Sequence, residues 1–251
     1  RCTWSDIASR SRQVANALDG EQLLFSDRIA TLAWNGYRHL ELYYGVSGSG
    51  RVLHTINPRL HPDQIAWIAN HAEDQILCFD LTFLPLVQAV HAKCPTIRKW
   101  VALCGPDKLP VDSGIPNLVS YENWVGGQST DYQWPVFDEN SASSMCYTSG
   151  TTGNPKAALY SHRSTMLHAY AAALPDVMRI SARDSVLPVV PMFHVNAWGL
   201  PIQCADPAVY SPVLTGVITP EGVDADALRR LIHQRFDLSL GTGLGKLKGR
   251  M

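Results

Sequence analysis

Apolar positions in the first hundred residues follow two spacings in turn, one typical of helices and the other of buried strands. Residues 4–18 repeat apolar side chains at helical spacing, and Ser5 is placed to cap the start of that helix. Three further segments have helical character: 37–46, 62–71 and 81–92. Short apolar, partly β-branched runs typical of strands stand around them: 28–34, 52–56, 75–79 and 100–103.

Repeated strand–helix units predict an α/β fold, in which a mainly parallel sheet carries helices on both faces. Between residues 105 and 140 prolines, glycines and polar residues are frequent, so we expect irregular connections and short elements there, with Trp124 and Trp134 as packing anchors. Residues 144–147 and 157–160 follow as short strands, and a helix is predicted over 163–173.

Composition is that of an ordinary globular protein and disfavours two kinds of partner. The 251 residues are 46% hydrophobic and 17% charged, which is enough to bury a sizeable core. A net charge of -1 gives no broad basic field for nucleic acid, and no apolar run approaches the roughly 18 residues of a membrane helix. Six cysteines without a C-x-x-C pair fit free thiols, so we expect a cytoplasmic protein. Because residue 1 is arginine rather than methionine, we also expect the amino terminus to lie upstream.

The segment with the clearest chemistry is 147–156, which reads YTSGTTGNPK. Gly150 and Gly153 permit backbone conformations that turn successive N–H groups into one concavity. Lys156 adds a positive charge that offsets phosphate. Four side chains add hydroxyl donors: Thr148, Ser149, Thr151 and Thr152. The segment therefore predicts a triphosphate-binding loop.

Two other interpretations fit this segment less well. A Gly/Ser/Thr-rich stretch is often only a flexible surface turn, but this order of residues is more specific than a turn requires. The spacing also differs from G-x-x-x-x-G-K-[ST], which excludes the nucleotide loop of that type.

The order of residues resembles the signature of the adenylate-forming superfamily, [YF]-T-S-G-[ST]-T-G-x-P-K-G, found in acyl-CoA synthetases, luciferases and adenylation domains. Every position over 147–156 matches, and Ala157 stands where the family usually has glycine. Two earlier segments, 27–35 and 54–68, extend the likeness over most of residues 1–200. The resemblance implies a partial N-terminal domain of the acyl-CoA synthetase fold.

A second motif agrees with the first. Residues 191–199, PMFHVNAWG, resemble the family's acyl-pocket motif in its fatty acyl-CoA synthetase form. By that likeness His194 would line the acyl pocket and Trp198 would gate the acyl tunnel. A buried histidine or tryptophan in an apolar run is by itself more often part of a core. The phosphate loop upstream favours the site interpretation.

The resemblance also implies the chemistry. A fatty or other apolar carboxylic acid would attack MgATP to give acyl-AMP and pyrophosphate, and coenzyme A would then displace AMP. Residues 148–153 would hold the β- and γ-phosphates, Lys156 would neutralise them, and Thr151 would help to hold Mg²⁺. His162 and His168 do not form a known metal-ligand set, and we interpret both as structural. The same interpretation applies to five other histidines: His39, His54, His61, His71 and His91.

The likeness stops after about residue 203. No Y-G-x-T-E segment, no [ST]-G-D segment and no carboxy-terminal lid with its lysine follow in the printed sequence. From about residue 207 the tail instead resembles the C-terminus of serine-glyoxylate and alanine-glyoxylate aminotransferases, as a short α+β segment with a strand at 213–218 and a helix at 224–235. Lys246 and Lys248 do not match the cofactor lysine of that family, so pyridoxal phosphate is disfavoured.

These observations predict two parts, an AMP-binding portion over 1–203 and an aminotransferase-like fragment over 207–251. The expected function is an acyl-CoA synthetase type ligase that uses ATP, Mg²⁺ and coenzyme A, with low or absent turnover in this chain. Two alternatives stay open: a non-catalytic nucleotide-binding remnant and a fragment of a pyridoxal-phosphate aminotransferase. A homodimer is a further expectation, because uncovered apolar surface favours pairing.

Overall fold

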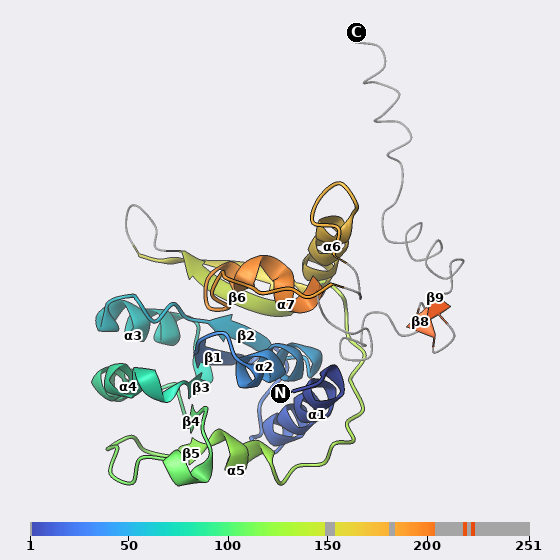
Figure 1. Cartoon of the computed structure of the whole chain (residues 1–251). Helices are drawn as coiled ribbons and strands as arrows, with labels where there is room; N and C mark the ends of the chain where they lie inside the picture. The colour runs from blue at the N-terminus through green and yellow to red at the C-terminus, as the bar shows by residue number, and fades with distance from the viewer. Residues whose placement is uncertain (1, 149–153, 181–183, 204–217, 220–221, 224–251) are drawn as a thin grey trace. The chain divides into compact units, whose positions relative to one another are not determined.

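The computed structural model describes residues 2–148, 154–180, 184–203, 218–219 and 222–223 (Figure 1). The chain divides into two units, Arg1–Pro212 and Val213–Met251. In the second unit, β8 (Ile218–Thr219) pairs with β9 (Gly222–Val223) in antiparallel orientation. The helix expected over 224–235 lies outside the described residues.

The first unit is built on a seven-stranded sheet in the order β5-β4-β3-β1-β2-β6-β7. Strands β1 to β6 pair in parallel, and β7 pairs with β6 in antiparallel orientation. Their bounds are β1 (Arg28–Leu32), β2 (Val52–Thr55), β3 (Asp74–Phe79), β4 (Lys99–Ala102), β5 (Leu118–Ser120), β6 (Ala142–Thr148) and β7 (Lys156–Ser161). The predicted α/β fold with a mainly parallel sheet is confirmed.

Helices cover both faces of this sheet. Figure 1 shows α1 (Trp4–Asp19) and α2 (Tyr37–Gly48) on one side of the strands, and α3 (Pro62–His71) and α4 (Leu84–Val90) on the other. The remaining helices are α5 (Tyr121–Val125), α6 (His162–Ala173) and α7 (Leu200–Gln203). Short 3-10 turns are η1 (Leu81–Phe83), η2 (His91–Lys93), η3 (Pro106–Lys108) and η4 (Val195–Gly199). No helix in the described ranges is long and apolar enough to cross a membrane.

Alternate side chains along the strands pack into two separate hydrophobic cores, one on each face of the sheet. Ile29 on β1 packs with α1 and α2, while its neighbours Ala30 and Leu32 pack with α3 and α4. Side chains of successive strand residues point to opposite faces, so a strand covered on both sides is apolar throughout. The apolar runs of the sequence reflect this double burial.

A glycine sets the distance between α1 and α2. A β-carbon added at Gly45 would lie 2.5 Å from Val14 Cγ1 and 2.8 Å from the carbonyl oxygen of Ser11. The two helices can therefore approach closely only because position 45 has no side chain. This contact fixes α2, whose first turn follows the carboxyl end of β1.

Two local predictions needed correction. The α1 cap is Thr3, whose hydroxyl accepts from the Asp6 N–H while the Asp6 carboxylate accepts from the Thr3 N–H, so the predicted cap at Ser5 was wrong. The stretch between residues 105 and 140, where we expected irregular connections and short elements, contains β5 and α5. The single helix expected over 81–92 is divided into η1, α4 and η2.

Candidate functional site

Carboxyl ends of the parallel strands meet at one edge of the sheet, and two predicted site residues, Thr148 and Lys156, lie at that edge. Strand β2 ends at Thr55 and β6 ends at Thr148, and the two strands pair in parallel. The sheet order also reverses beside β1, because β2 lies on one side of it and β3 on the other. Ligands of doubly wound sheets bind outside the carboxyl ends of the strands at such a point.

The predicted phosphate loop joins β6 to β7. At its base Thr148 pairs with Lys156, and the Thr148 hydroxyl donates to the Lys156 carbonyl oxygen at 3.3 Å. Lys156 is exposed, and the salt bridges of the described residues do not include it. Five predicted site residues lie outside the described residues: Ser149, Gly150, Thr151, Thr152 and Gly153. The loop base therefore carries an exposed lysine and a threonine hydroxyl, two groups chemically suited to a phosphate.

The second predicted motif lies across the same sheet edge, held by Asn35 at the end of the β1–α2 connection. The Asn35 amide donates to the carbonyl oxygens of Pro188 and Val190 at 3.0 and 3.1 Å, and its oxygen accepts from the Met192 N–H at 2.6 Å. Tyr43 on α2 donates its hydroxyl to the Met192 carbonyl oxygen at 2.5 Å. These bonds hold Met192, near the start of the motif, against the β1–α2 connection and α2.

Asn196 fastens the centre of this motif to two strands. Its side-chain oxygen accepts from the Thr55 hydroxyl at 2.9 Å, and its amide donates to the Ser144 hydroxyl at 3.0 Å. Four consecutive residues around it have positive φ: Val195 (49°), Asn196 (49°), Ala197 (49°) and Trp198 (56°). Non-glycine residues adopt this left-handed conformation at a cost of roughly 1–2 kcal/mol each. Such strain persists only where surrounding contacts fix the backbone, as Asn196 does here.

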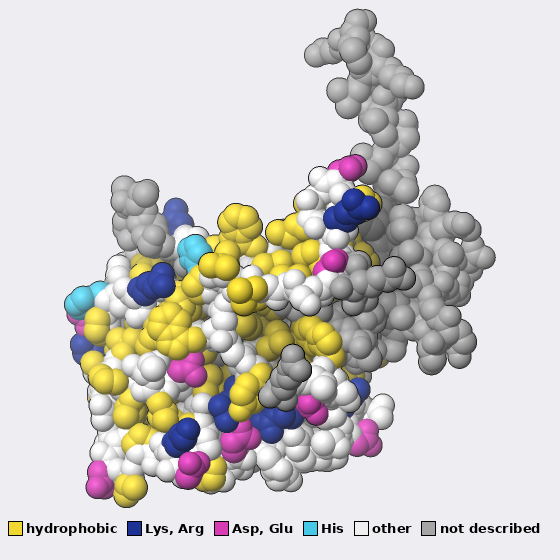
Figure 2. Space-filling view, viewed as in Figure 1, with side chains coloured by type: hydrophobic (Ala, Val, Ile, Leu, Met, Phe, Trp, Pro, Cys, Tyr) yellow, Lys and Arg dark blue, Asp and Glu magenta, His cyan; other side chains and the backbone are white. Residues whose placement is uncertain are grey.

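Trp198 lines a cavity of about 610 Å³ between α2, β6, α6 and η4. Its carbonyl oxygen lies 2.9 Å from His168 Nε2, which ties the gate candidate to α6. His194 is exposed and does not line this cavity. Figure 2 shows exposed apolar side chains over the same part of the molecule, around β7, α6 and α7. The cavity is therefore suited to an apolar ligand.

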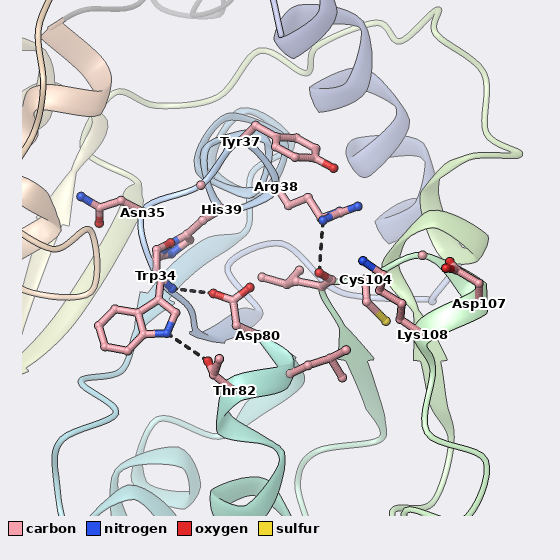
Figure 3. Close-up of a pocket in the computed structure, with 14 residues that line it drawn as sticks. Trp34, Asn35, Tyr37, Arg38, His39, Asp80, Thr82, Cys104, Asp107 and Lys108 are labelled. Atoms are coloured by element: carbon pink, nitrogen blue, oxygen red, sulfur yellow. Dashed lines mark hydrogen bonds between the residues drawn. The ribbon is translucent and has the colours of Figure 1, made fainter. Parts of the chain in front are cut away.

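Another cavity, of about 560 Å³, opens at the carboxyl ends of β1, β3 and β4 (Figure 3). The Trp34 N–H donates to Asp80 Oδ2 at 2.7 Å and its indole donates to the Thr82 hydroxyl at 3.0 Å. Burial raises the pKa of Asp80. Arg38 in the same wall pairs with Glu122 at 2.7 Å. Acids and cations balance around this cavity, so its charges do not specify one ligand.

The described side chains offer little for binding a metal ion. The part of the chain that the structure describes holds no cluster of three His, Cys, Asp or Glu side chains able to bind a metal ion. His162 is buried against Phe137, at 4.8 Å between ring centroids, and burial lowers its pKa to about 4. Thr151, the predicted Mg²⁺ residue, lies outside the described residues.

Sequence reasoning missed several polar residues that organise this edge. Asn35 bonds to Met192, and Thr55 bonds to Asn196. The partners in each bond are far apart in the sequence, so no local spacing reveals them. His54 forms a buried pair with Asp74, although the sequence offered no acid near it. A signal was present for Asn35, since it follows directly after an apolar strand, where α/β proteins place ligand-binding loops.

Comparison with known proteins identifies relatives of the same kind over most of the chain. Residues 1–205 match the family model described as AMP-binding enzyme. A medium-chain-fatty-acid–CoA ligase of Ectopseudomonas oleovorans is 49% identical, covering 89% of this chain and 42% of its own length. A 3-methylmercaptopropionyl-CoA ligase of Ruegeria lacuscaerulensis is 54% identical over 82% of this chain and 38% of that protein. The chain thus spans about two fifths of the length of these relatives.

Solved structures share the fold. The anthranilate CoA ligase AuaEII, in complex with anthranoyl-AMP, superposes with a TM-score of 0.69 at 21% identity, over 78% of this chain and 38% of that one. A fatty acyl CoA synthetase of Mycobacterium tuberculosis gives a TM-score of 0.67 at 22% identity, over 82% and 38%. The family match, the close relatives and this shared fold agree: the chain belongs to the AMP-binding enzyme family.

Proposed function

We propose that this chain is the ATP-binding portion of an acyl-CoA ligase that activates an apolar carboxylic acid. The observation that carries the proposal is the base of the β6–β7 loop, where Thr148 pairs with Lys156 inside the segment YTSGTTGNPK, which matches the family signature at every position before Ala157. Relatives at about 50% identity bear the names of CoA ligases.

In this proposal the loop residues hold the β- and γ-phosphates of ATP. Thr148 to Gly153 donate hydrogen bonds, and Lys156 offsets the negative charge. Mg²⁺ would supply positive charge that offsets the phosphates, and Thr151 is the residue that family likeness assigns to holding it. The acid carboxylate would then attack the α-phosphorus, releasing pyrophosphate, and the thiol of coenzyme A would later displace AMP.

The acid class follows from the 610 Å³ cavity. Its lining includes Trp198, Met178 and Tyr43. Apolar walls favour a fatty or other apolar acid over a charged one. Relatives named for medium-chain fatty acids and for 3-methylmercaptopropionate are consistent with this class.

The proposal also covers location, assembly and the division of the chain. We place the protein in the cytoplasm and allow a homodimer through the exposed apolar side chains around β7. We also propose the division into 1–203 and 207–251, with the second part like the C-terminus of a class V aminotransferase. We expect no bound pyridoxal phosphate. Its absorbance in the purified chain would contradict this expectation.

The test is pyrophosphate release from MgATP with carboxylic acids of increasing chain length, measured on the chain as printed and on Lys156→Ala. Release that needs both the acid and Lys156 supports the ligase function in this chain. Binding of MgATP without release of pyrophosphate would instead support the alternative of a non-catalytic nucleotide-binding remnant.

A matched control separates the role of Lys156 from a general loss of charge. Lys93 is also exposed and pairs only at the surface, with Asp63, both side chains being more than half exposed. Surface pairs of this kind contribute little to stability, so Lys93→Ala should behave like the unmodified chain. Equal effects of Lys93→Ala and Lys156→Ala would argue against a specific phosphate role for Lys156.

A further inference from the structure

A fully buried acid–histidine pair lies beside Tyr147, the residue before Thr148. His54 on β2 and Asp74 on β3 both have no exposed surface, and His54 Nδ1 lies 2.9 Å from each carboxylate oxygen of Asp74. Within the described residues, His54 Nε2 is buried without a hydrogen-bond partner. The proposed reaction uses neither side chain.

The backbone around Asp74 is shaped to turn this carboxylate inward. Glu73 before it has a φ of 54°, and the β1–β3 register shifts so that Gln75 is an extra residue between the partners of Arg28 and Ile29. Bulges of this kind re-aim a side chain and are common beside functional sites. The strand between β2 and β3 is β1, where the small Ala30 faces the same core and leaves room for the pair.

Such a pair is costly as a stabilising device. Burial raises the pKa of Asp74, with the neighbouring His54 acting in the opposite direction. Apolar side chains of similar size often stabilise a core as well or better than a buried pair does. A polar pair does fix one geometry, because its hydrogen bonds are lost in any other arrangement.

The pair supports the position of the Tyr147 side chain. The His54 ring packs against the Tyr147 ring, with 5.2 Å between centroids. On the other side, the Tyr147 hydroxyl lies 2.6 Å from His71 Nδ1, and His71 stacks on Trp67 at 4.6 Å. Burial, with a further contribution from Asp74, raises the pKa of Tyr147 to about 12.

Tyr147 in turn is the last residue of β6 before the base of the loop. It pairs with Ala157 across the β6–β7 ladder, and the next pair is Thr148 with Lys156. A shift of the Tyr147 side chain would therefore move both groups that the structure places at the loop base. Within the described residues β7 ends the sheet, so β6 is the strand that holds Lys156 in register.

We propose that Asp74 and His54 are positioning residues for the phosphate site, acting through Tyr147 on Thr148 and Lys156. The binding consequence rests on the proposed function, whereas the effect on the β6–β7 backbone does not. His71 completes the arrangement by holding the Tyr147 hydroxyl.

The first experiment measures backbone amide exchange without any ligand, on the full chain and on Asp74→Asn and Tyr147→Phe. Tyr147→Phe keeps the ring that His54 contacts and removes only the hydroxyl that His71 holds, so it tests the step from Tyr147 to the loop base even if Asp74→Asn fails to fold. We expect about tenfold faster exchange in peptides covering 142–148 and 156–161, with β4 unchanged. Equal acceleration across the whole sheet, or none at the β6–β7 ends, would overturn the proposal.

His39→Gln is the matched control. His39 is also a fully buried histidine with a polar partner, the Thr31 hydroxyl at 3.0 Å, but it lies on α2 and faces the other core. Its replacement should speed exchange around β1 and α2 and leave the β6–β7 ends as they are. A loss of order at the β6–β7 ends in this variant as well would show that any buried histidine has the same effect.

The second experiment measures the dissociation constant for MgATP by calorimetry on the same variants. We expect about a five- to tenfold weaker MgATP complex for Tyr147→Phe and Asp74→Asn, with His39→Gln unchanged. Should the unmodified chain not bind MgATP, the proposed function fails, and amide exchange alone decides the positioning role. Unchanged MgATP affinity together with faster exchange would restrict the pair to a backbone role and overturn its link to the phosphate site.

Discussion

Strands β1 and β7 show how differently two parts of one sheet are covered. In β1 four of five residues are buried, and Ile29, Ala30 and Leu32 have no exposed surface. In β7 no residue is buried, and Leu159 is 63% exposed. The first strand lies between two cores, whereas the second lies at the edge with apolar side chains uncovered.

This contrast separates support from chemistry. Strands β1 to β4, with helices on both faces, form a closed platform. The candidate site lies where this platform meets β6, β7 and η4, which carry Lys156, Asn196 and Trp198. Binding groups on loops held by a rigid scaffold are a common arrangement, because the scaffold limits their motion. The exposed apolar face remains available for a ligand or for another part of a protein.

The largest expected effect comes from comparing truncations in the two strand environments. Phe79→Ala on β3 empties a fully buried position and should lower the free energy of unfolding by about 3–5 kcal/mol. Leu159→Ala on β7 should change it by no more than about 0.5 kcal/mol, because that side chain is mostly exposed. Urea unfolding of both variants checks the pair, and a similar loss in both would mean that the β7 face is covered in solution.

A smaller effect is expected from pH at His39 inside the platform. Burial lowers the pKa of His39 from 6.5 to about 4. The unfolded chain then binds a proton that the folded chain does not, so stability is complete above pH 6.5 and falls as the pH drops towards 4. The full change for one such group is on the order of 3 kcal/mol.

His39→Gln isolates this term, because His162 and the buried carboxyl groups titrate in both proteins. The unfolding free energy of the unmodified chain should fall more steeply between pH 6.5 and 4.5 than that of the variant. Parallel curves would show that His39 does not lose its proton on folding.

The smallest effect tests the strain of the open region. Val195 has a φ of 49° and is 40% exposed, so Val195→Gly should raise the free energy of unfolding by about 0.5–1 kcal/mol after the entropic cost of glycine. Val189 is 85% exposed and has no positive φ, so Val189→Gly should stabilise nothing. Thermal melts compare the two. Destabilisation by both would mean that the left-handed turn carries no strain at Val195.

Much of the platform could be predicted because its elements are long and periodic. The range of α3 was predicted at 62–71, as observed, since Pro62 starts it and apolar residues recur along it. By contrast, β5 contains only Leu118, Val119 and Ser120, too few residues for a period to show. The α1 cap was misplaced because Thr3 and Ser5 are both capping residues, and only the reciprocal bonds with Asp6 distinguish them.

The site divides in the same way. The phosphate loop could be recognised because its chemistry is continuous in sequence, and the motif containing His194 and Trp198 is continuous as well. The Asp74–His54 pair could not, since the two residues are 20 positions apart in the chain and lie on different strands, with a bulge at Gln75 beside Asp74. Contacts of Asn196 with β2 and β6 depend on sheet order, which local patterns do not determine.

The central claim is that the loop between β6 and β7 binds the phosphates of MgATP through Lys156. Isothermal titration of MgATP into the full chain, Lys156→Ala and Lys93→Ala tests it most directly. The account predicts saturable binding to the full chain and to Lys93→Ala, and at least about tenfold weaker binding to Lys156→Ala, which is the loss of one charge-assisted contact. Binding of equal strength to all three proteins would place the nucleotide elsewhere and contradict the account.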